Sequence, residues 1–463
     1  MTSPHRVHLT ALVSILVACG CGSSSVSGAA GGGGGGISAS SGATMSTGAA
    51  GHGGMGAGGQ GPSGPVDAST IEGKLMMGYQ GWFACPGDGA PPNRWVHWFG
   101  LQDPVATNAT FDLWPDTGEL DPDELFPTKM TLIGGGAASL YSAWNAKTVD
   151  RHFRWMAENG LDGVFLQRFL SELTDPAFLA LRDKVAANVR TGAEAHGRVF
   201  AIMYDVSGSP EATLVDDLKK DWAYLVDVLG LTKSPTYLKD GGRPVLAVWG
   251  LGYKDRPGTA AQAAAIVDFF RTAAGPSHVV TLMGGVPRDW RTLSGDSRTD
   301  PAWASVYRSF DILSPWTVGA FVDNAGADAY QKGSLAPDIA DAKASGFRYM
   351  PVVFPGFSWT NLSGGPLNQI PRKGGAFYWH QVYNALSAGS TMLYGAMFDE
   401  VDEGTAMFKI APTKATLPAQ GTFLSLDADG LALSSDFYLR LAGAATLRVR
   451  KQAPLEDKVP IGP

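Results

Sequence analysis

Eight short apolar runs, rich in β-branched and aromatic residues, recur along the chain between residues 74 and 400. Each run is continuous rather than alternating with polar residues, which is typical of parallel strands buried on both faces. The runs occupy residues 74–82, 161–169, 198–208, 243–252, 278–286, 310–319, 348–359 and 390–400. This recurrence predicts a parallel sheet of eight strands.

Segments with helical spacing lie between several of these runs and after the last one. Gly or Asn-Gly ends several of them, as in AKTVDRHFRWMAENG, and Ser434 or Ser435 is a candidate N-cap for a final helix. Eight strand and helix pairs indicate an α/β fold, a (β/α)8 TIM barrel. An open, doubly wound sheet is the alternative, which the lack of a G-x-G-x-x-G turn after the first strand disfavours.

The connection after the first strand is much longer than the others and covers roughly residues 83–146. In a barrel, such an insertion lies on the face that carries active sites and builds the walls of the cleft. We therefore expect a long insertion after the first strand beside the functional site.

The N-terminus has the pattern of an export signal. Arg6 and His8 precede an apolar run that is too short to span a bilayer, and LVAC at 16–19 resembles a lipobox with Cys19 as the lipidated residue. A signal peptide cleaved elsewhere is the alternative. These features predict a lipid-anchored protein of a bacterial cell envelope, on the outer membrane or the cell surface and outside the cytoplasm.

The segment after Cys19 is rich in Gly, Ser and Ala and has no charged residue from Gly20 to Val66. Such a composition cannot bury enough apolar surface to fold. We expect four regions: a signal peptide at 1–19, a flexible tether at 20–68, a catalytic domain at 69–452 and a tail at 453–463.

The charge balance argues for an uncharged partner. The chain has 36 basic and 43 acidic residues, a net charge of -7, so it has no basic excess for nucleic acid. Thirteen Trp and thirteen Tyr are a rich supply of flat amphipathic rings, which suit the faces of sugars. We therefore expect a carbohydrate partner, no nucleic acid, and a membrane contact through the lipid anchor.

The carboxyl ends of barrel strands meet at one cleft, so the residues there are candidates for substrate binding. They supply aromatic rings, amides and carboxylates, which match the apolar faces and hydroxyl edges of a sugar. The candidates are Tyr79, Trp82, Trp98, Gln167, Arg168, Tyr204, Asp205, Trp249, Trp316 and Asp399.

The last strand ends in FDEVDE, with four acidic side chains in five positions. Glu400 and Glu403 are three residues apart and can converge on one substrate. Glycoside hydrolysis commonly uses two carboxyl groups, and repulsion between them raises the pKa of one, which suits a proton donor. The sequence thus predicts Glu400 and Glu403 as catalytic residues.

The stretch FDEVDEGT resembles the Glu-x-x-Glu-Gly-Thr motif of glycoside hydrolase family 99, the endo-α-mannosidases, and is similar to the Asp-x-x-Glu arrangement of the family 71 α-glucanases. GYQGWF, GRPVLAVWGLGY and DADGLALSSDFYLRLAG are similar to bacterial proteins of a 71/99-like group, some labelled xylosidase/arabinosidase. The resemblance covers residues 70–450 and implies a retaining glycoside hydrolase.

By the same resemblance, Glu403 is the general acid/base and Glu400 is the base for the sugar 2-hydroxyl, with a 1,2-anhydro intermediate. Val401 stands where the family usually has Trp, and Asp399 and Asp402 are additional acidic residues. The sugar specificity therefore does not carry over with the motif.

Other readings of the chain remain open. A glycan-binding protein without catalysis would use the same aromatic residues at the cleft to hold a sugar. Calcium could bind the acidic stretches DEVDE and DADG, although neither has the spacing of a twelve-residue calcium loop. His97, His152, His196, His278 and His380 do not have zinc-site spacing, so we expect no metal and no cofactor.

Overall fold

The computed structural model describes residues 64–463. The predicted lipidation site Cys19 and the tether up to residue 63 lie outside the described residues. Each of the eight predicted runs contains a barrel strand, so the predicted strand count is confirmed. The strands are β1 (Leu75–Tyr79), β4 (Gly163–Phe169), β5 (Val199–Asp205), β7 (Arg243–Trp249), β8 (Thr281–Val286), β9 (Ile312–Pro315), β10 (Arg348–Tyr349) with β11 (Val352–Val353), and β12 (Leu393–Gly395).

All neighbouring pairs of barrel strands are parallel, and the sheet closes on itself. β10 pairs with β9 and β11 pairs with β12, and only Met350 and Pro351 separate β10 from β11. These two short pieces act as one seventh strand that joins the two ends of the sheet. The structure therefore confirms the (β/α)8 barrel and excludes the open sheet.

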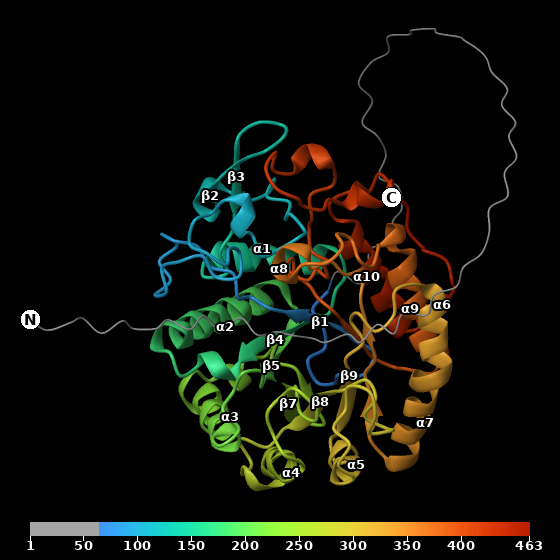
Figure 1. Cartoon of the computed structure of the whole chain (residues 1–463). Coiled ribbons are helices and arrows are strands. Elements are labelled where there is room, and N and C mark those ends of the chain that lie inside the picture. Colours follow the sequence, from blue (N-terminus) through green and yellow to red (C-terminus); the bar gives the residue numbers. More distant parts are fainter. Residues whose placement is uncertain (1–63) are drawn as a thin grey trace, which may run out of the picture. The chain divides into compact units, whose positions relative to one another are not determined.

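Helices surround the strands, as Figure 1 shows. They are α1 (Ala146–Glu158), α2 (Pro176–His196), α3 (Leu214–Ala223), α4 (Ala260–Asp268), α5 (Ala302–Tyr307), α6 (Asn324–Tyr330), α7 (Ala336–Ser345), α8 (Thr360–Ser363), α9 (Ala376–Ser387) and α10 (Phe437–Val449). α3, α4 and α6 each continue into a π-helical turn, at Tyr224–Val228, Phe269–Ala273 and Gln331–Leu335.

Local sequence signals set several helix ends. Asp175 caps α2 by accepting the N–H of Ala177, and Gly197 ends that helix in the left-handed conformation at φ 60°. The last helix differs from the expectation, because its N-cap is Asp436 rather than Ser434 or Ser435. Ser434 instead donates its hydroxyl to the Asp436 carboxylate at 2.6 Å.

The insertion between β1 and α1 contains a small antiparallel hairpin, β2 (Phe126–Thr131) and β3 (Ala137–Leu140). It packs against the segment that follows β12. The N–H groups of Asp112 and Leu113 both donate to the Val401 carbonyl, and Leu424 donates its N–H to the Asp112 carbonyl at 2.7 Å. The long insertion is thus confirmed, and it contacts the acidic turn after the last strand.

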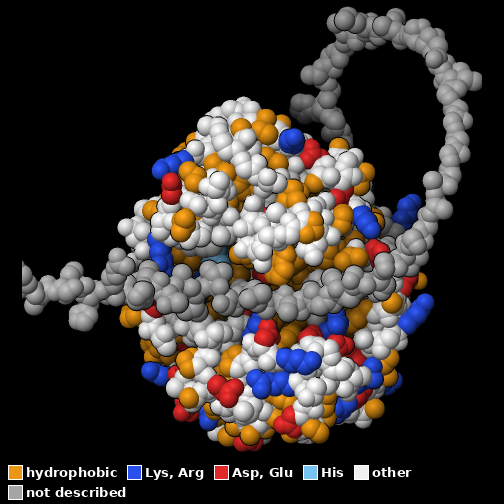
Figure 2. Space-filling view, in the orientation of Figure 1, with side chains coloured by type: hydrophobic (Ala, Val, Ile, Leu, Met, Phe, Trp, Pro, Cys, Tyr) orange, Lys and Arg blue, Asp and Glu red, His pale blue; other side chains and the backbone are white. Residues whose placement is uncertain are grey.

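The face of the molecule shown in Figure 2 has no single dominant charge. Acidic and basic side chains are interspersed over the face shown in Figure 2, with hydrophobic atoms between them. Among the described residues, no helix combines the length and the apolar character that crossing a bilayer requires.

Candidate active site

The acidic turn after β12 is joined directly to the end of β1. Asp399 is 1% exposed and accepts the backbone N–H groups of Gln80 and Gly81 at 2.7 and 2.9 Å. Burial raises the pKa of Asp399 to about 7, although these two hydrogen bonds favour its ionised form. Asp399 therefore fixes the turn to the first strand, and its two oxygens are engaged by the backbone.

Glu400 is held by two side chains. Gln80 donates its amide N–H to one carboxylate oxygen at 2.5 Å, and the Thr405 hydroxyl donates to the other at 2.6 Å. Burial and the nearby charge of Asp402 raise the pKa of Glu400, while both hydrogen bonds favour its ionised form. Thr405 of the Glu-x-x-Glu-Gly-Thr motif thus has a direct task, the orientation of Glu400.

The backbone conformation at position 404 of the same motif requires a glycine. Its φ is +66°, and a Cβ there would lie 2.7 Å from the Ser358 nitrogen. Ser358 donates that N–H to the Glu403 carbonyl at 2.9 Å. Any side chain at position 404 would push apart the contact that places the backbone of Glu403.

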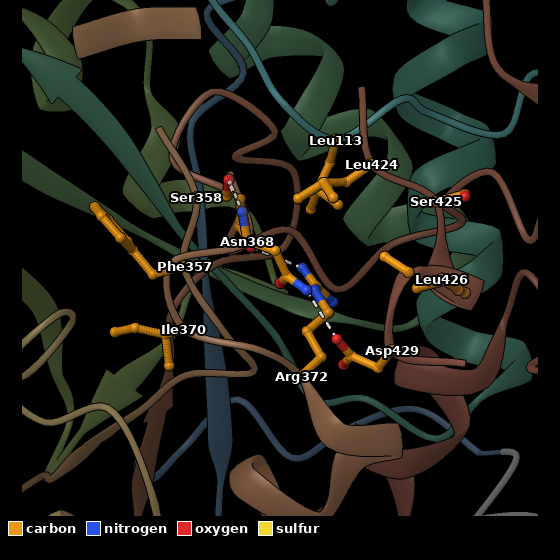
Figure 3. A pocket seen from close by; sticks show the side chains of 12 residues that line it. Leu113, Phe357, Ser358, Asn368, Ile370, Arg372, Leu424, Ser425, Leu426 and Asp429 are labelled. Carbon is orange, nitrogen blue, oxygen red and sulfur yellow. Dashed lines mark hydrogen bonds between the residues drawn. The ribbon is translucent and has the colours of Figure 1, made fainter. Parts of the chain in front are cut away.

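A small pocket lies behind this turn, and Figure 3 shows the side chains that line it. Asn368 donates its backbone N–H to the Ser358 hydroxyl and its amide to Asp429, while Arg372 donates to the carbonyls of Gly404 and Ala406. The volume of about 10 Å³ is enough for roughly one water molecule. The pocket supports the turn from behind and is too small for a sugar.

Glu403 differs from Glu400 because it is partly exposed and has no side-chain hydrogen bond among the described residues. Burial and the charges of Glu400 and Asp402 raise its pKa well above the ordinary value, and Arg256 opposes this effect. Glu403 is therefore a carboxyl group that takes up a proton more readily than an ordinary Glu, and no side chain among the described residues occupies its oxygens.

The mouth is defined as the side chains around Glu403 at the carboxyl ends of the barrel strands. His97, which belongs to the insertion, lies on one side of this mouth. Its imidazole is stacked on Trp82, with ring centroids 3.8 Å apart and planes within 6°. The Nδ1 atom lies 3.6 Å from an oxygen of the buried Asp402. His97 thus contacts both Trp82 and Asp402, the residue that precedes Glu403.

A second group of side chains lies at the ends of β5 and β7 and just after β9. Asp205 is 9% exposed, accepts the N–H of Ser207 at 2.7 Å, and has a pKa raised to about 6 by burial. Trp249 lies 5.7 Å from the Arg256 guanidinium and 5.8 Å from the ring of Trp316, in an edge contact. This group offers two indole rings, one carboxyl group and one cation.

Several buried polar atoms around this mouth have no hydrogen-bond partner within residues 64–463. Leaving such atoms unpaired costs on the order of 1–3 kcal/mol each, so proteins usually avoid it outside functional sites. They are Gln80 Oε1, Trp82 Nε1, Gln167 Oε1, Trp249 Nε1, Arg256 Nε and Asp402 Oδ1. Three are donors and three are acceptors, and each atom has almost no exposed surface.

Four predicted binding residues lie away from the mouth, and these predictions are wrong. Tyr79 bonds to His152 of α1 at 2.9 Å, and Trp98 donates its indole N–H to the Tyr141 carbonyl inside the insertion at 3.0 Å. Arg168 and Tyr204 both bond to Asp221 of α3, behind the barrel wall. The physical reason for the three strand residues is alternation, because neighbouring side chains on a strand point to opposite faces.

Gln167 does point into the barrel, where its amide donates to the Tyr394 hydroxyl at 3.2 Å. Contacts and charge interactions connect the following predicted residues: Trp82, Gln167, Asp205, Trp249, Trp316, Asp399, Glu400 and Glu403. Their roles toward a substrate stay predictions.

Sequence reasoning missed four residues of the site, namely Gln80, His97, Arg256 and Thr405. Gln80 was detectable, because it has the same strand parity as the inward-facing Gly78, whose Cβ would meet Met397 and the Tyr394 hydroxyl in the barrel. Thr405 is part of the motif itself. His97 and Arg256 lie in irregular loops, and no local sequence signal marks them.

A hollow of about 460 Å³ lies further along the same end of the barrel, after β8 and β9. Most of its lining residues belong to the chain segment that follows Trp316. The lining residues are Arg288, Ala320, Phe321, Val322, Asp323, Gly326, Ala329 and Tyr330.

A possible cation site lies elsewhere, in the insertion. The side chains of Asp121, Asp123 and Glu124 have oxygens within 4.8 Å of one another. Lys147 lies 2.7 Å from Asp121 and 2.9 Å from Asp123, and Arg151 lies 2.5 Å from Glu124. The chain's own cations therefore already neutralise this group, which argues against a metal.

Comparison with known proteins shows similarity in structure but not in sequence. No protein-family model matches the chain, and no curated protein matches it either. A solved structure of the GH99 endo-α-mannosidase from Bacteroides thetaiotaomicron in complex with Bis-Tris propane is 15% identical, with a TM-score of 0.58 over 83% of this chain and 99% of that one.

A second structure of the endo-α-mannosidase from that organism is 14% identical, with a TM-score of 0.58 over 82% of this chain and 99% of that one. At this level of identity the likeness concerns the fold. The chain has the (β/α)8 fold of the family 99 glycoside hydrolases, the fold that the resemblance of FDEVDEGT implied.

Proposed function

We propose that this protein is a retaining glycoside hydrolase that cleaves an oligosaccharide or polysaccharide outside the cytoplasm. The observation that carries the proposal is the contrast between Glu400 and Glu403. Burial and neighbouring charge raise the pKa of both groups, that of Glu400 to about 8 and that of Glu403 well above its ordinary value, but only Glu400 is held by two donors that favour its carboxylate form. The two carboxyl groups therefore hold a proton with unequal strength, and such a pair is suited to acid and base roles.

In the proposed reaction, Glu403 protonates the glycosidic oxygen as the bond to the leaving group breaks. Glu400 accepts the proton of the sugar 2-hydroxyl, and that oxygen attacks the anomeric carbon to give a 1,2-anhydro sugar. Glu403, now ionised, then removes a proton from water, and the water oxygen attacks the anomeric carbon. The bond from that carbon to the 2-oxygen breaks, and Glu400 returns its proton to the 2-oxygen. Both groups regain their starting states, and two inversions give net retention.

The side chains of the mouth support a saccharide as substrate. Trp249 and Trp316 are partly exposed and present indole rings that suit the apolar faces of a sugar. The hollow beyond Trp316 gives room for further sugar units at the same end of the barrel. The solved structures that share this fold are named endo-α-mannosidases, which also favours a glycosidase.

The decisive experiment compares the wild type with Glu400→Gln and Glu403→Gln. Purified protein is incubated with aryl α- and β-glycosides, α-mannan, α-glucan and xylan, and new reducing ends are measured. We expect each variant to lose at least about a thousandfold in kcat/KM while its melting temperature and glycan affinity are kept.

Asp338→Asn is the matched control, since Asp338 is a buried carboxyl that contacts Trp290, Arg291 and Tyr349 outside the mouth. Full activity of both Gln variants would refute the assignment. Glycan affinity without new reducing ends in the wild type would show instead a glycan-binding protein.

A further inference from the structure

Asp402 and His97 have no role in the reaction proposed above, although they lie at its centre. Asp402 stands in the turn between Glu400 and Glu403 and is 3% exposed. One of its oxygens has no partner within the described chain, and the other lies 3.6 Å from His97 Nδ1. A buried carboxyl in this place needs an explanation, because burying it carries a free-energy penalty.

The imidazole of His97 is placed by its surroundings. The residue has a left-handed φ of 60°, an uncommon conformation for a side chain other than Gly. The Thr110 hydroxyl donates to its carbonyl at 2.8 Å, and the ring is stacked on Trp82. Backbone strain and close packing together direct Nδ1 toward Asp402.

We propose that His97 and Asp402 form a positioning pair, which holds the turn between Glu400 and Glu403 and keeps one exchangeable proton beside both carboxyl groups. The inference rests on the proposed function, and it adds a tuning element from the insertion to a site otherwise built at the barrel strand ends. His97 and Asp402 act through the two glutamates and are not assigned contact with the reacting atoms.

The charges around Asp402 explain how the pair works. His97, Asp112 and Tyr141 face it from the insertion, and Asp399, Glu400 and Glu403 belong to its own turn. Burial and the charge of Asp112 raise the pKa of Asp402, so it takes up a proton more readily than an exposed Asp. When ionised, its charge raises the pKa of both glutamates.

The imidazole can serve both states of Asp402. Burial lowers the pKa of His97 to about 3, so the ring is neutral and has one N–H and one bare nitrogen. The two atoms lie 3.6 Å apart, just beyond hydrogen-bond distance, so the pair needs a small approach; a protonated Asp402 then donates to a bare Nδ1, and an ionised Asp402 accepts from Nδ1–H. A change of tautomer therefore keeps the contact while the charge between the two glutamates changes.

The first test is the pH dependence of kcat/KM in Asp402→Asn. Removing the negative charge should let Glu400 and Glu403 ionise at lower pH, so both limbs of the bell-shaped profile should move down by about one pH unit. Asp338→Asn should leave both limbs in place. A profile of Asp402→Asn with unmoved limbs would overturn the proposal, whatever the loss of rate.

The second test is a double-mutant cycle with His97→Asn. Asn tolerates the left-handed backbone but removes the stacked ring and the Nδ1 contact. We expect each single variant to lose about tenfold in kcat/KM and the double variant to lose little more than the worse single one. Losses that multiply would show two independent residues and would contradict a pair.

The third test needs no substrate and therefore separates this inference from the proposed function. Protein labelled with ¹⁵N-histidine is titrated by NMR, and His97→Asn assigns the His97 signals. In the wild type the tautomer balance of His97 should change as Asp402 titrates, and in Asp402→Asn it should stay constant. A wild-type balance that does not change with pH would refute the pair even if hydrolysis is found.

Discussion

Gln80, one residue beyond β1, donates its amide N–H to Glu400, which follows β12, at 2.5 Å. The two residues are 320 positions apart in the chain and lie in the segments that follow the first and last strands of the barrel. Gln80→Met should keep the side-chain length but remove the donor. We expect kcat/KM to fall by about a hundredfold and the acidic limb of the pH profile to move to higher pH, since the ionised form of Glu400 loses a hydrogen bond. Thr405→Val should move the limb in the same direction, and steady-state kinetics from pH 4 to 9 checks both.

Trp249 and Trp98 make a matched pair for testing the mouth. The Nε1 of Trp249 has no partner in the described chain, whereas that of Trp98 donates to the Tyr141 carbonyl. Trp249→Phe should raise KM about fivefold and leave the melting temperature nearly unchanged. Trp98→Phe should cost about 1 kcal/mol of stability and leave KM unchanged. The opposite pattern would place the substrate elsewhere.

Asp205 should make stability depend on pH. Its folded pKa, raised to about 6, exceeds the unfolded value of about 4, so the native state holds a proton in this window that the unfolded chain has released. Stability from this group is therefore full below about pH 4 and is lost as the pH rises through about 6, by at most about 3 kcal/mol. Asp205→Asn should lessen this fall, as urea denaturation at pH 4 and pH 7 can measure. Equal slopes for both proteins would contradict a raised pKa.

Tyr204→Phe tests whether Tyr204 lies away from the substrate, as its bond to Asp221 indicates. Its hydroxyl donates to Asp221 at 2.6 Å, beside the ion pair of Asp221 with Arg168. We expect a loss of about 1–2 kcal/mol in the free energy of unfolding, with kcat and KM unchanged. A large rise in KM at unchanged stability would return Tyr204 to the binding site.

Cys19→Ala tests the membrane anchor, which stays a prediction. Cells fed a labelled fatty acid should incorporate label into the wild type and not into the variant, and the variant should leave the membrane fraction. An alternative signal cleavage site would leave both proteins unlabelled.

The barrel was predictable because continuous apolar runs and helical segments repeat eight times, and a parallel sheet follows from that pattern alone. The acidic turn was also predictable, since Glu400 to Thr405 are adjacent in the chain. The errors at Tyr79, Arg168 and Tyr204 came from treating every residue at a strand end as facing the cleft. Applying the two-residue alternation of strands would have removed them, as Arg168 and Tyr204 are register partners on the outer face.

Other features of the site could not be predicted from the sequence. His97 and Arg256 reach the mouth from loops whose path depends on packing between distant segments, such as the bonds of Asp112 and Leu113 to Val401. Local propensity carries no information about such contacts. The same reason explains Trp98, which folds into the interior of the insertion instead of lining the mouth.

The bonds from Gln80 and Gly81 to Asp399 have a consequence for the order in which the protein becomes active. Because the first and last barrel strands share one acidic turn, a ribosome that has made only the first seven strands has made no working site. Under the proposed function, activity therefore arrives only after the segment that follows β12 has been made, and a fragment that lacks β1 or that segment has no complete site.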